Sequence, residues 1–290
     1  MKANVYYEKL IRSLRYRQDI TITQHNLDYK NNSYKFLKIV SNAIQSTDKI
    51  ILISAGFHGE EKAGPITLLK YINLILNYIH ANNLKVIIYP NVNPVGFEKG
   101  KRYNPDSDTG ENKSDTNDFM RYIREDGTVT DDLKEQNVFK EWRWSSDEEF
   151  NLRLPEETKL VHILLKEDPL QQIVAAIDLH QDYITKNAPP AAYQYIYGDA
   201  SVYSKIFRKI EKFTPLLRNT YIDAGYSNGG LKSDSNGCLI RYDCTISDLM
   251  QRLGAKHVVT VETTGATPLK KACEVNLAWI LGITDLNKLK

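Results

Sequence analysis

Four apolar runs constrain the fold of this chain more than any other feature of its sequence. They are rich in β-branched residues and nearly continuous in apolar character, without a strict alternation of apolar and polar positions. Such runs are typical of strands that are covered on both faces, as in a parallel sheet. The four predicted strands are Lys49–Gly56, Lys85–Asn93, Ile173–Leu179 and His257–Glu262.

Helical patterns lie between and after these runs. Apolar residues recur at steps of three and four over Pro65–His80 and over Ser201–Phe213, which predicts amphipathic helices. Thr267 and Pro268 predict the start of a last helix, and Gly282 predicts its end. Strands that alternate with helices predict an α/β fold built from crossover units.

Residues 98–160 differ from the rest of the chain because they are charged and rich in Asn and Asp, and nearly lack aliphatic runs. Two interpretations remain open for this polar insertion. It is either a solvated loop or a segment that covers a substrate, since long loops are often functional. Nothing in its composition indicates a separate domain.

Composition narrows the class of protein. The chain has 290 residues, 42% of them apolar, and a net charge of +2 with both signs mixed throughout. A dedicated nucleic-acid-binding protein usually carries a clustered basic face, so we expect no nucleic-acid partner. No stretch approaches the ~20 apolar residues of a membrane span, and the N-terminus lacks the apolar core of a secretory signal. With three cysteines, an odd number, a reducing compartment is the simpler interpretation, and we expect a cytoplasmic protein.

Ionisable side chains follow three of the four predicted strands. The first strand runs into His58 and Glu61, the third into His180, and the fourth ends at Glu262. Ligands of open α/β sheets collect at the carboxyl ends of the strands, so these residues can converge there. Two histidines and two glutamates are what a catalytic zinc site needs, because such a site uses three protein ligands and keeps one position open.

Each of these residues also has a plainer interpretation. His58 alone is a loop histidine, although Gly56 and Gly59 beside it allow a tight turn between strand and helix. Asp178 points to the same side of an extended chain as His180, either as an orienting carboxylate or as a structural acid. A lone Glu262 at a strand end would more often be a hydrogen-bonded structural group than a catalyst.

Taken in order, these motifs resemble the zinc carboxypeptidase family, the M14-type metallopeptidases. The succinylglutamate desuccinylase and aspartoacylase deacylases share its superfamily. The landmarks are Gly-x-His-Gly-x-Glu after a strand, Asn-x-Asn-Pro-x-Gly, Asp-x-Asn, Asp-Leu-His and a strand that ends in Glu. The resemblance implies a single catalytic domain over residues 1–290, with the polar insertion 98–160 inside it. It also implies a mixed, mostly parallel central sheet flanked by helices, of the phosphorylase/hydrolase-like type.

The resemblance implies roles for individual residues. His58, Glu61 and His180 would hold one Zn²⁺ per chain, and Glu262 would be the general acid/base that activates the zinc-bound water. Arg102 is similar to the arginine that polarises the scissile carbonyl group. Substrate binding would fall to a further group, in which Asn117 matches the asparagine that holds the terminal carboxylate and Tyr242 lies near the place of the family's flexible tyrosine.

One position departs from the family pattern. The family usually has Asp-x-Asn-Arg, whereas Asp118 follows Asn117 here. An arginine grips a carboxylate with two parallel hydrogen bonds, and an aspartate would repel it. Either Arg121 or Arg241 takes over this contact, or the substrate lacks a free α-carboxylate.

The resemblance implies a zinc-dependent hydrolase of a peptide (amide) bond, of the carboxypeptidase type. Two alternatives stay open. The same site serves a deacylase of N-acyl amino acids, and a metal-free binding protein could keep the fold without the chemistry. The expected partner is a peptide or an N-acyl amino acid, and neither a membrane partner nor an oligomeric state is predicted.

Overall fold

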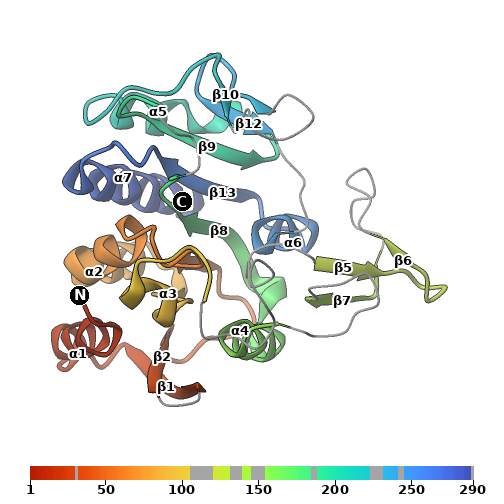
Figure 1. The fold of residues 1–290 in the computed structure, drawn as a ribbon. Coiled ribbons are helices and arrows are strands. Elements are labelled where there is room, and N and C mark those ends of the chain that lie inside the picture. Colours follow the sequence, from red (N-terminus) through yellow and green to blue (C-terminus); the bar gives the residue numbers. More distant parts are fainter. Residues whose placement is uncertain are drawn as a thin grey trace.

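The computed structural model describes residues 1–29, 32–104, 120–130, 139–144, 154–183, 188–222, 231–240 and 245–288. An eight-stranded mixed sheet forms its centre, in the order β1-β2-β4-β3-β8-β13-β9-β12 (Figure 1). The strands are β1 (Ile20–Tyr29), β2 (Asn32–Ser41), β3 (Ile50–Ala55), β4 (Lys85–Tyr89), β8 (Ile173–Leu179), β9 (Ala192–Tyr197), β12 (Cys238–Ile240) and β13 (His257–Thr263).

The four predicted strands are confirmed, in chain order, as β3, β4, β8 and β13. In the sheet they are neighbours at its centre, in the order β4-β3-β8-β13. They are mutually parallel, since β3 pairs in parallel with both β4 and β8, and β13 pairs in parallel with β8. Every residue of β3 is buried, as expected for a strand with helices on both faces. Because the four strands run the same way, their carboxyl ends meet at one edge of the sheet.

Helices cover this sheet on both sides. In Figure 1, α1, α2 and α7 lie together along one side, and α4 and α6 lie toward the other. The helices are α1 (Ala3–Leu14), α2 (Ala63–Ala81), α3 (Pro94–Lys99), α4 (Glu156–Glu167), α5 (Ser204–Ile210), α6 (Ile246–Arg252) and α7 (Leu269–Asn287), with short 3₁₀ turns η1 (Leu170–Gln172) and η2 (Ala200–Tyr203). The α/β fold with a mixed, mostly parallel sheet is therefore confirmed. None of the helices in the described ranges is both long and apolar enough to span a bilayer.

The predicted end of the last helix was wrong. Gly282 lies inside α7 rather than after it. A Cβ atom at this position would lie 2.5 Å from Cγ1 of Ile206, so the glycine lets α7 approach α5 closely. The helix start was placed correctly, because α7 begins at Leu269, directly after Pro268.

The described parts of residues 98–160 contain a small antiparallel sheet that the sequence pattern did not predict. It consists of β5 (Met120–Ile123), β6 (Val129–Thr130) and β7 (Glu141–Trp144). The sheet is tied to the main body by the hydroxyl of Tyr122, which donates to Asp248 of α6 at 3.0 Å. Another small sheet has two strands, β10 (Tyr221–Ile222) and β11 (Leu231–Lys232).

Helix α1 supports the turn that follows β4. The hydroxyl of Tyr6 donates to the carbonyl oxygen of Pro90 at 3.1 Å, and that of Tyr7 donates to the carbonyl oxygen of Asn91 at 2.7 Å. Both tyrosines are fully buried. The N-terminal helix is thus anchored directly behind the turn that leads into α3.

Candidate metal centre

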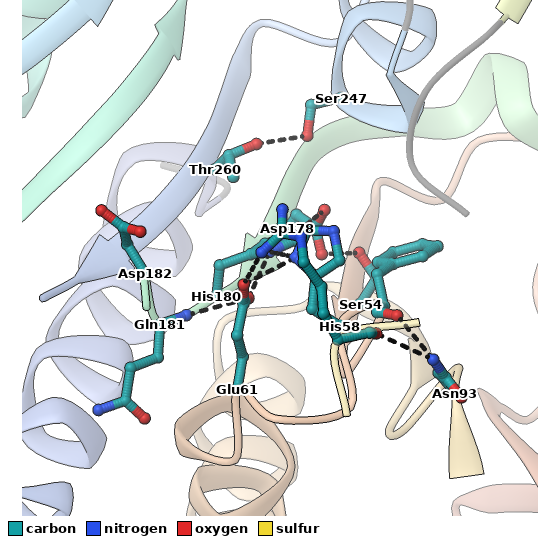
Figure 2. A network of polar contacts seen from close by, with 12 residues as sticks. Ser54, His58, Glu61, Asn93, Asp178, His180, Gln181, Asp182, Ser247 and Thr260 are labelled. Carbon is teal, nitrogen blue, oxygen red and sulfur yellow. Dashed lines mark hydrogen bonds and ion pairs between the residues drawn. The ribbon is translucent and has the colours of Figure 1, made fainter. Parts of the chain in front are cut away.

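Three side chains meet at the carboxyl edge of the parallel strands. Nδ1 of His58 lies 2.8 Å from Oε1 of Glu61, and Nδ1 of His180 lies 2.8 Å from Oε2 of the same carboxylate. The two imidazole Nδ1 atoms are 3.2 Å apart. All three side chains are buried, and Figure 2 shows them pointing toward one another. The structure therefore brings together the predicted ligand set.

This group fits a zinc ion by its chemistry and its spacing. One atom from each of the three residues lies within 4.8 Å of the others, and no other such group occurs in the described part of the chain. Two ligands of a tetrahedral zinc ion, each about 2.1 Å from it, are roughly 3.4 Å apart. The observed separations of 2.8, 2.8 and 3.2 Å are somewhat shorter, so a small outward shift would let the three atoms bind one ion.

Backbone packing places His58 and Glu61. Gly56 follows β3 with a φ of +72°, a conformation that favours glycine. A Cβ atom on Gly59 would lie 2.0 Å from the carbonyl carbon of Gly96, so the turn that carries both ligands packs backbone to backbone against α3. No residue other than glycine fits at this contact.

Asn93 joins three segments around this turn. Its Oδ1 accepts from the backbone amide of Gly96 at 2.8 Å and caps α3. Its Nδ2 donates to the carbonyl oxygens of Phe57 at 3.4 Å and of Arg102 at 3.3 Å. In the sequence, Asn93 is the second asparagine of the Asn-x-Asn-Pro-x-Gly motif. An asparagine directly before a proline is a signal for a helix cap.

The imidazole of His180 is oriented from behind by a carboxylate. Its Nε2 lies 2.9 Å from Oδ2 of Asp178, and the hydroxyl of Ser54 donates to Oδ1 of the same aspartate at 2.8 Å. This leaves Nδ1 of His180 facing the centre. Of the two interpretations of Asp178, the geometry therefore supports an orienting carboxylate, the arrangement common behind metal-binding histidines.

Electrostatics favour a charged carboxylate in this group. Burial opposes the ionisation of Glu61, but the His58 and His180 imidazoles outweigh it and hold the pKa of Glu61 well below its ordinary value. Burial also opposes the protonation of His180, but Asp178 and Glu61 raise the pKa of this imidazole well above its ordinary value. Without a metal ion, this electrostatic setting favours a proton on the His180 imidazole beside the ionised Glu61 carboxylate. A metal ion would have to displace that proton, because histidine binds metals in its neutral form.

We expect the Asp178→Asn variant to bind zinc about 10–100-fold more weakly than the wild type, the usual cost of removing an outer-shell carboxylate. The asparagine keeps an oxygen for the Ser54 hydroxyl, so the protein should still fold. Isothermal titration calorimetry with zinc measures the affinity. Unchanged affinity with an unchanged melting temperature would show that Asp178 does not orient His180.

Glu262 lies beside this group, near the end of β13. The backbone amides of His180 and Asp182 donate to the carbonyl oxygens of Val261 and Thr263, on either side of Glu262. Glu262 is buried, and its Oε2 has no hydrogen-bond partner among the described residues. Burial raises its pKa well above the ordinary value, and the charge of Glu61 raises it further. A buried carboxyl group with a raised pKa and an unpartnered oxygen is suited to exchanging protons in general acid–base work.

Arg102 reaches the ligand set directly, since its Nη1 donates to Oε1 of Glu61 at 2.9 Å. Tyr103 contacts both Arg102 and His58 through its ring. Its ring is 5.7 Å from the Arg102 guanidinium carbon and 6.5 Å, edge to face, from the His58 ring. No local sequence signal marks this tyrosine, because its partner in the metal centre, His58, comes from another segment.

The predicted substrate-binding residues are placed only in part. Asn117, Arg241 and Tyr242 lie outside the described residues. Arg121 is buried on β5, opposite Arg143 of β7. Because side chains alternate along a strand, it points to the other face of the small sheet from Tyr122. That Arg121 or Arg241 takes the place of the family arginine stays a prediction.

The α/β fold carries a His-Glu-His group that could hold a metal ion, with a buried glutamate beside it. A family model described as zinc carboxypeptidase matches residues 14–265. The chain belongs to this family.

Comparison with known structures supports the fold. The chain is similar to a candidate metallopeptidase from Shewanella amazonensis SB2B at 19% identity and a TM-score of 0.69, over 99% of this chain and 95% of that one. A candidate metallopeptidase from Shewanella baltica OS155 matches at 21% identity and a TM-score of 0.67, over 98% and 91%. Carboxypeptidase A from Helicoverpa armigera matches at 14% identity and a TM-score of 0.56, over 96% and 69%. A search of curated proteins gave no match.

Proposed function

We propose that the protein is a zinc-dependent hydrolase that cleaves a peptide (amide) bond, as a metallopeptidase of the carboxypeptidase type. The observation that carries this proposal is the convergence of His58, Glu61 and His180 beside a buried glutamate at one edge of the sheet. Membership of the zinc carboxypeptidase family supports it independently.

Each residue of the centre would have a defined task. His58, Glu61 and His180 would hold the ion, which when bound supplies a Lewis acid and lowers the pKa of a water molecule to about 7. Glu262 would take the proton of the attacking water and deliver it to the leaving nitrogen as the C–N bond breaks. General acid–base catalysis of this kind is worth about 10²–10⁴-fold.

Arg102 would stabilise the negative charge that develops on the carbonyl oxygen of the substrate. Its guanidinium is already in the centre, beside Glu61, so it is preorganised where charge stabilisation contributes most. Its carbonyl oxygen accepts from the amide of Gly59 at 3.0 Å, which fixes its backbone relative to the turn that carries His58 and Glu61.

A second candidate function is the removal of an acyl group from an N-acyl amino acid. The observation that favours it is Asp118, which stands where the family usually has the arginine that binds a substrate carboxylate. A deacylase and a carboxypeptidase would use the same His58, Glu61, His180 and Glu262, so the centre itself does not separate them.

A substrate panel separates the two functions. Zinc-loaded protein is incubated with short peptides that have a free or an amidated carboxyl terminus, and with N-acetyl, N-succinyl and N-formyl amino acids. We expect release of the terminal amino acid from the free-carboxyl peptides. Turnover of the N-acyl amino acids alone would establish the deacylase, and no turnover of any member would contradict both.

A further inference from the structure

A buried glutamate outside the metal centre holds the segment that carries Arg102. The amide Nδ2 of Asn104, two residues after Arg102, donates to both carboxylate oxygens of Glu157 at 3.1 and 3.0 Å. The two residues are 53 positions apart in the chain, and both are buried. A buried carboxyl group without hydrogen-bond partners costs free energy. Breaking the contact with Asn104 would therefore destabilise this arrangement.

Tyr29 completes the clamp from a third segment. Its hydroxyl donates to Oε2 of Glu157, and it accepts from the backbone amide of Glu157 at 3.3 Å. Tyr29 is the last residue of β1 and Glu157 lies in the first turn of α4. The carboxylate thus links the edge of the sheet, the start of a helix and the segment after α3.

Only one residue separates the clamp from Arg102. That residue is Tyr103, whose ring contacts both the Arg102 guanidinium and the edge of the His58 ring. Upstream, the Arg102 carbonyl oxygen accepts from Gly59 and Asn93. The backbone of residues 102–104 is therefore fixed at both ends, on the metal-ligand turn at one end and on Glu157 at the other.

We infer that Glu157 and Asn104 are positioning residues for the reaction: they hold residues 102–104 so that the Arg102 guanidinium stays beside the metal ligands. This inference rests on the proposed hydrolase function. A displacement of about 1 Å in a catalytic group can cost on the order of 10²-fold in rate, so loosening this segment should lower kcat without abolishing substrate binding.

Glutamine is a close mimic of one protonation state of Glu157. Burial raises the pKa of this carboxyl group to about 7, against the lowering effect of the Tyr29 hydrogen bond. The neutral acid and the carboxylate are thus both populated near neutral pH. The Glu157→Gln variant keeps an acceptor for Asn104, whereas Glu157→Met has a similar shape and no acceptor.

The experiment compares Glu157→Met, Glu157→Gln and Asn104→Ala with an Asp168→Asn control. Asp168 is a half-buried acid directly after the other end of α4, where it accepts from Tyr89 and Lys38. We expect kcat to fall at least tenfold in Glu157→Met and in Asn104→Ala, with KM and zinc content within about twofold of the wild type. Glu157→Gln should restore kcat to within about threefold, and Asp168→Asn should keep it within twofold.

Hydrogen exchange provides a readout that does not need activity. The Gly59 amide, which donates to the Arg102 carbonyl oxygen, should exchange at least tenfold faster in Glu157→Met than in the wild type or in Asp168→Asn. If the wild type hydrolyses nothing, the proposed function fails while this measurement still tests the clamp. Unchanged exchange at Gly59, or unchanged kcat in folded Glu157→Met and Asn104→Ala, would overturn the inference.

Discussion

Replacing Glu262 with glutamine should lower kcat by about 10²–10⁴-fold, the contribution expected of a general acid–base group. The glutamine has nearly the same shape but can neither take the water proton nor return it to the leaving nitrogen. Steady-state kinetics on the best substrate of the panel measures the loss. Zinc content, measured by mass spectrometry of the metal, should stay at one per chain, because Glu262 is not among the three converging ligands.

The same variant should fold as well as the wild type. Oε2 of Glu262 has no hydrogen-bond partner in the described part of the structure, so little is lost when it becomes an amide. Burial already favours the neutral form of this side chain, which glutamine resembles. Turnover near the wild-type value in zinc-loaded Glu262→Gln would refute the catalytic assignment.

Replacing His58 with alanine should weaken zinc binding by roughly 10²–10³-fold. The binding free energy of a structural zinc site with four ligands is about 10–16 kcal/mol. One ligand accounts for roughly a quarter of it, about 2.5–4 kcal/mol. Each 1.4 kcal/mol changes the dissociation constant tenfold. At substoichiometric zinc, the activity of His58→Ala should fall in proportion to the zinc that it fails to bind. Calorimetric titration of metal-free protein with zinc gives the affinity directly.

The matched control is His257→Ala. His257 begins β13, lies outside the converging group and packs its ring against Tyr203 at 6.0 Å. Its removal is expected to lower stability somewhat and to leave zinc affinity unchanged. Tight, stoichiometric zinc in His58→Ala would exclude this histidine as a ligand.

Features with a strong local signal were predictable from the sequence. The apolar run Ile173–Leu179 coincides with β8, and the run before Gly56 became β3. The parallel order of these strands follows from the alternation with helices, and it alone places His58 and His180 at one edge. The position of these residues at the carboxyl ends of the strands was therefore enough to predict that they converge.

Features that depend on distant contacts were not predictable. Glu157 looks like an ordinary acidic residue at a helix start, and only the fold brings Asn104 and Tyr29 to it. Gly282 carries the usual signal for a helix end, yet packing against Ile206 decides its place inside α7. In both cases a tertiary contact that the local pattern does not contain decides what the residue does.

The order of strands in the sheet has a consequence for biosynthesis. His58 and His180 are 122 residues apart, and β8, which leads to His180, is flanked by β3 and by the late strand β13. Pairing over such long separations is slow because loop closure costs entropy first. A chain emerging from the ribosome therefore lacks its complete centre until β13 has been translated and docked.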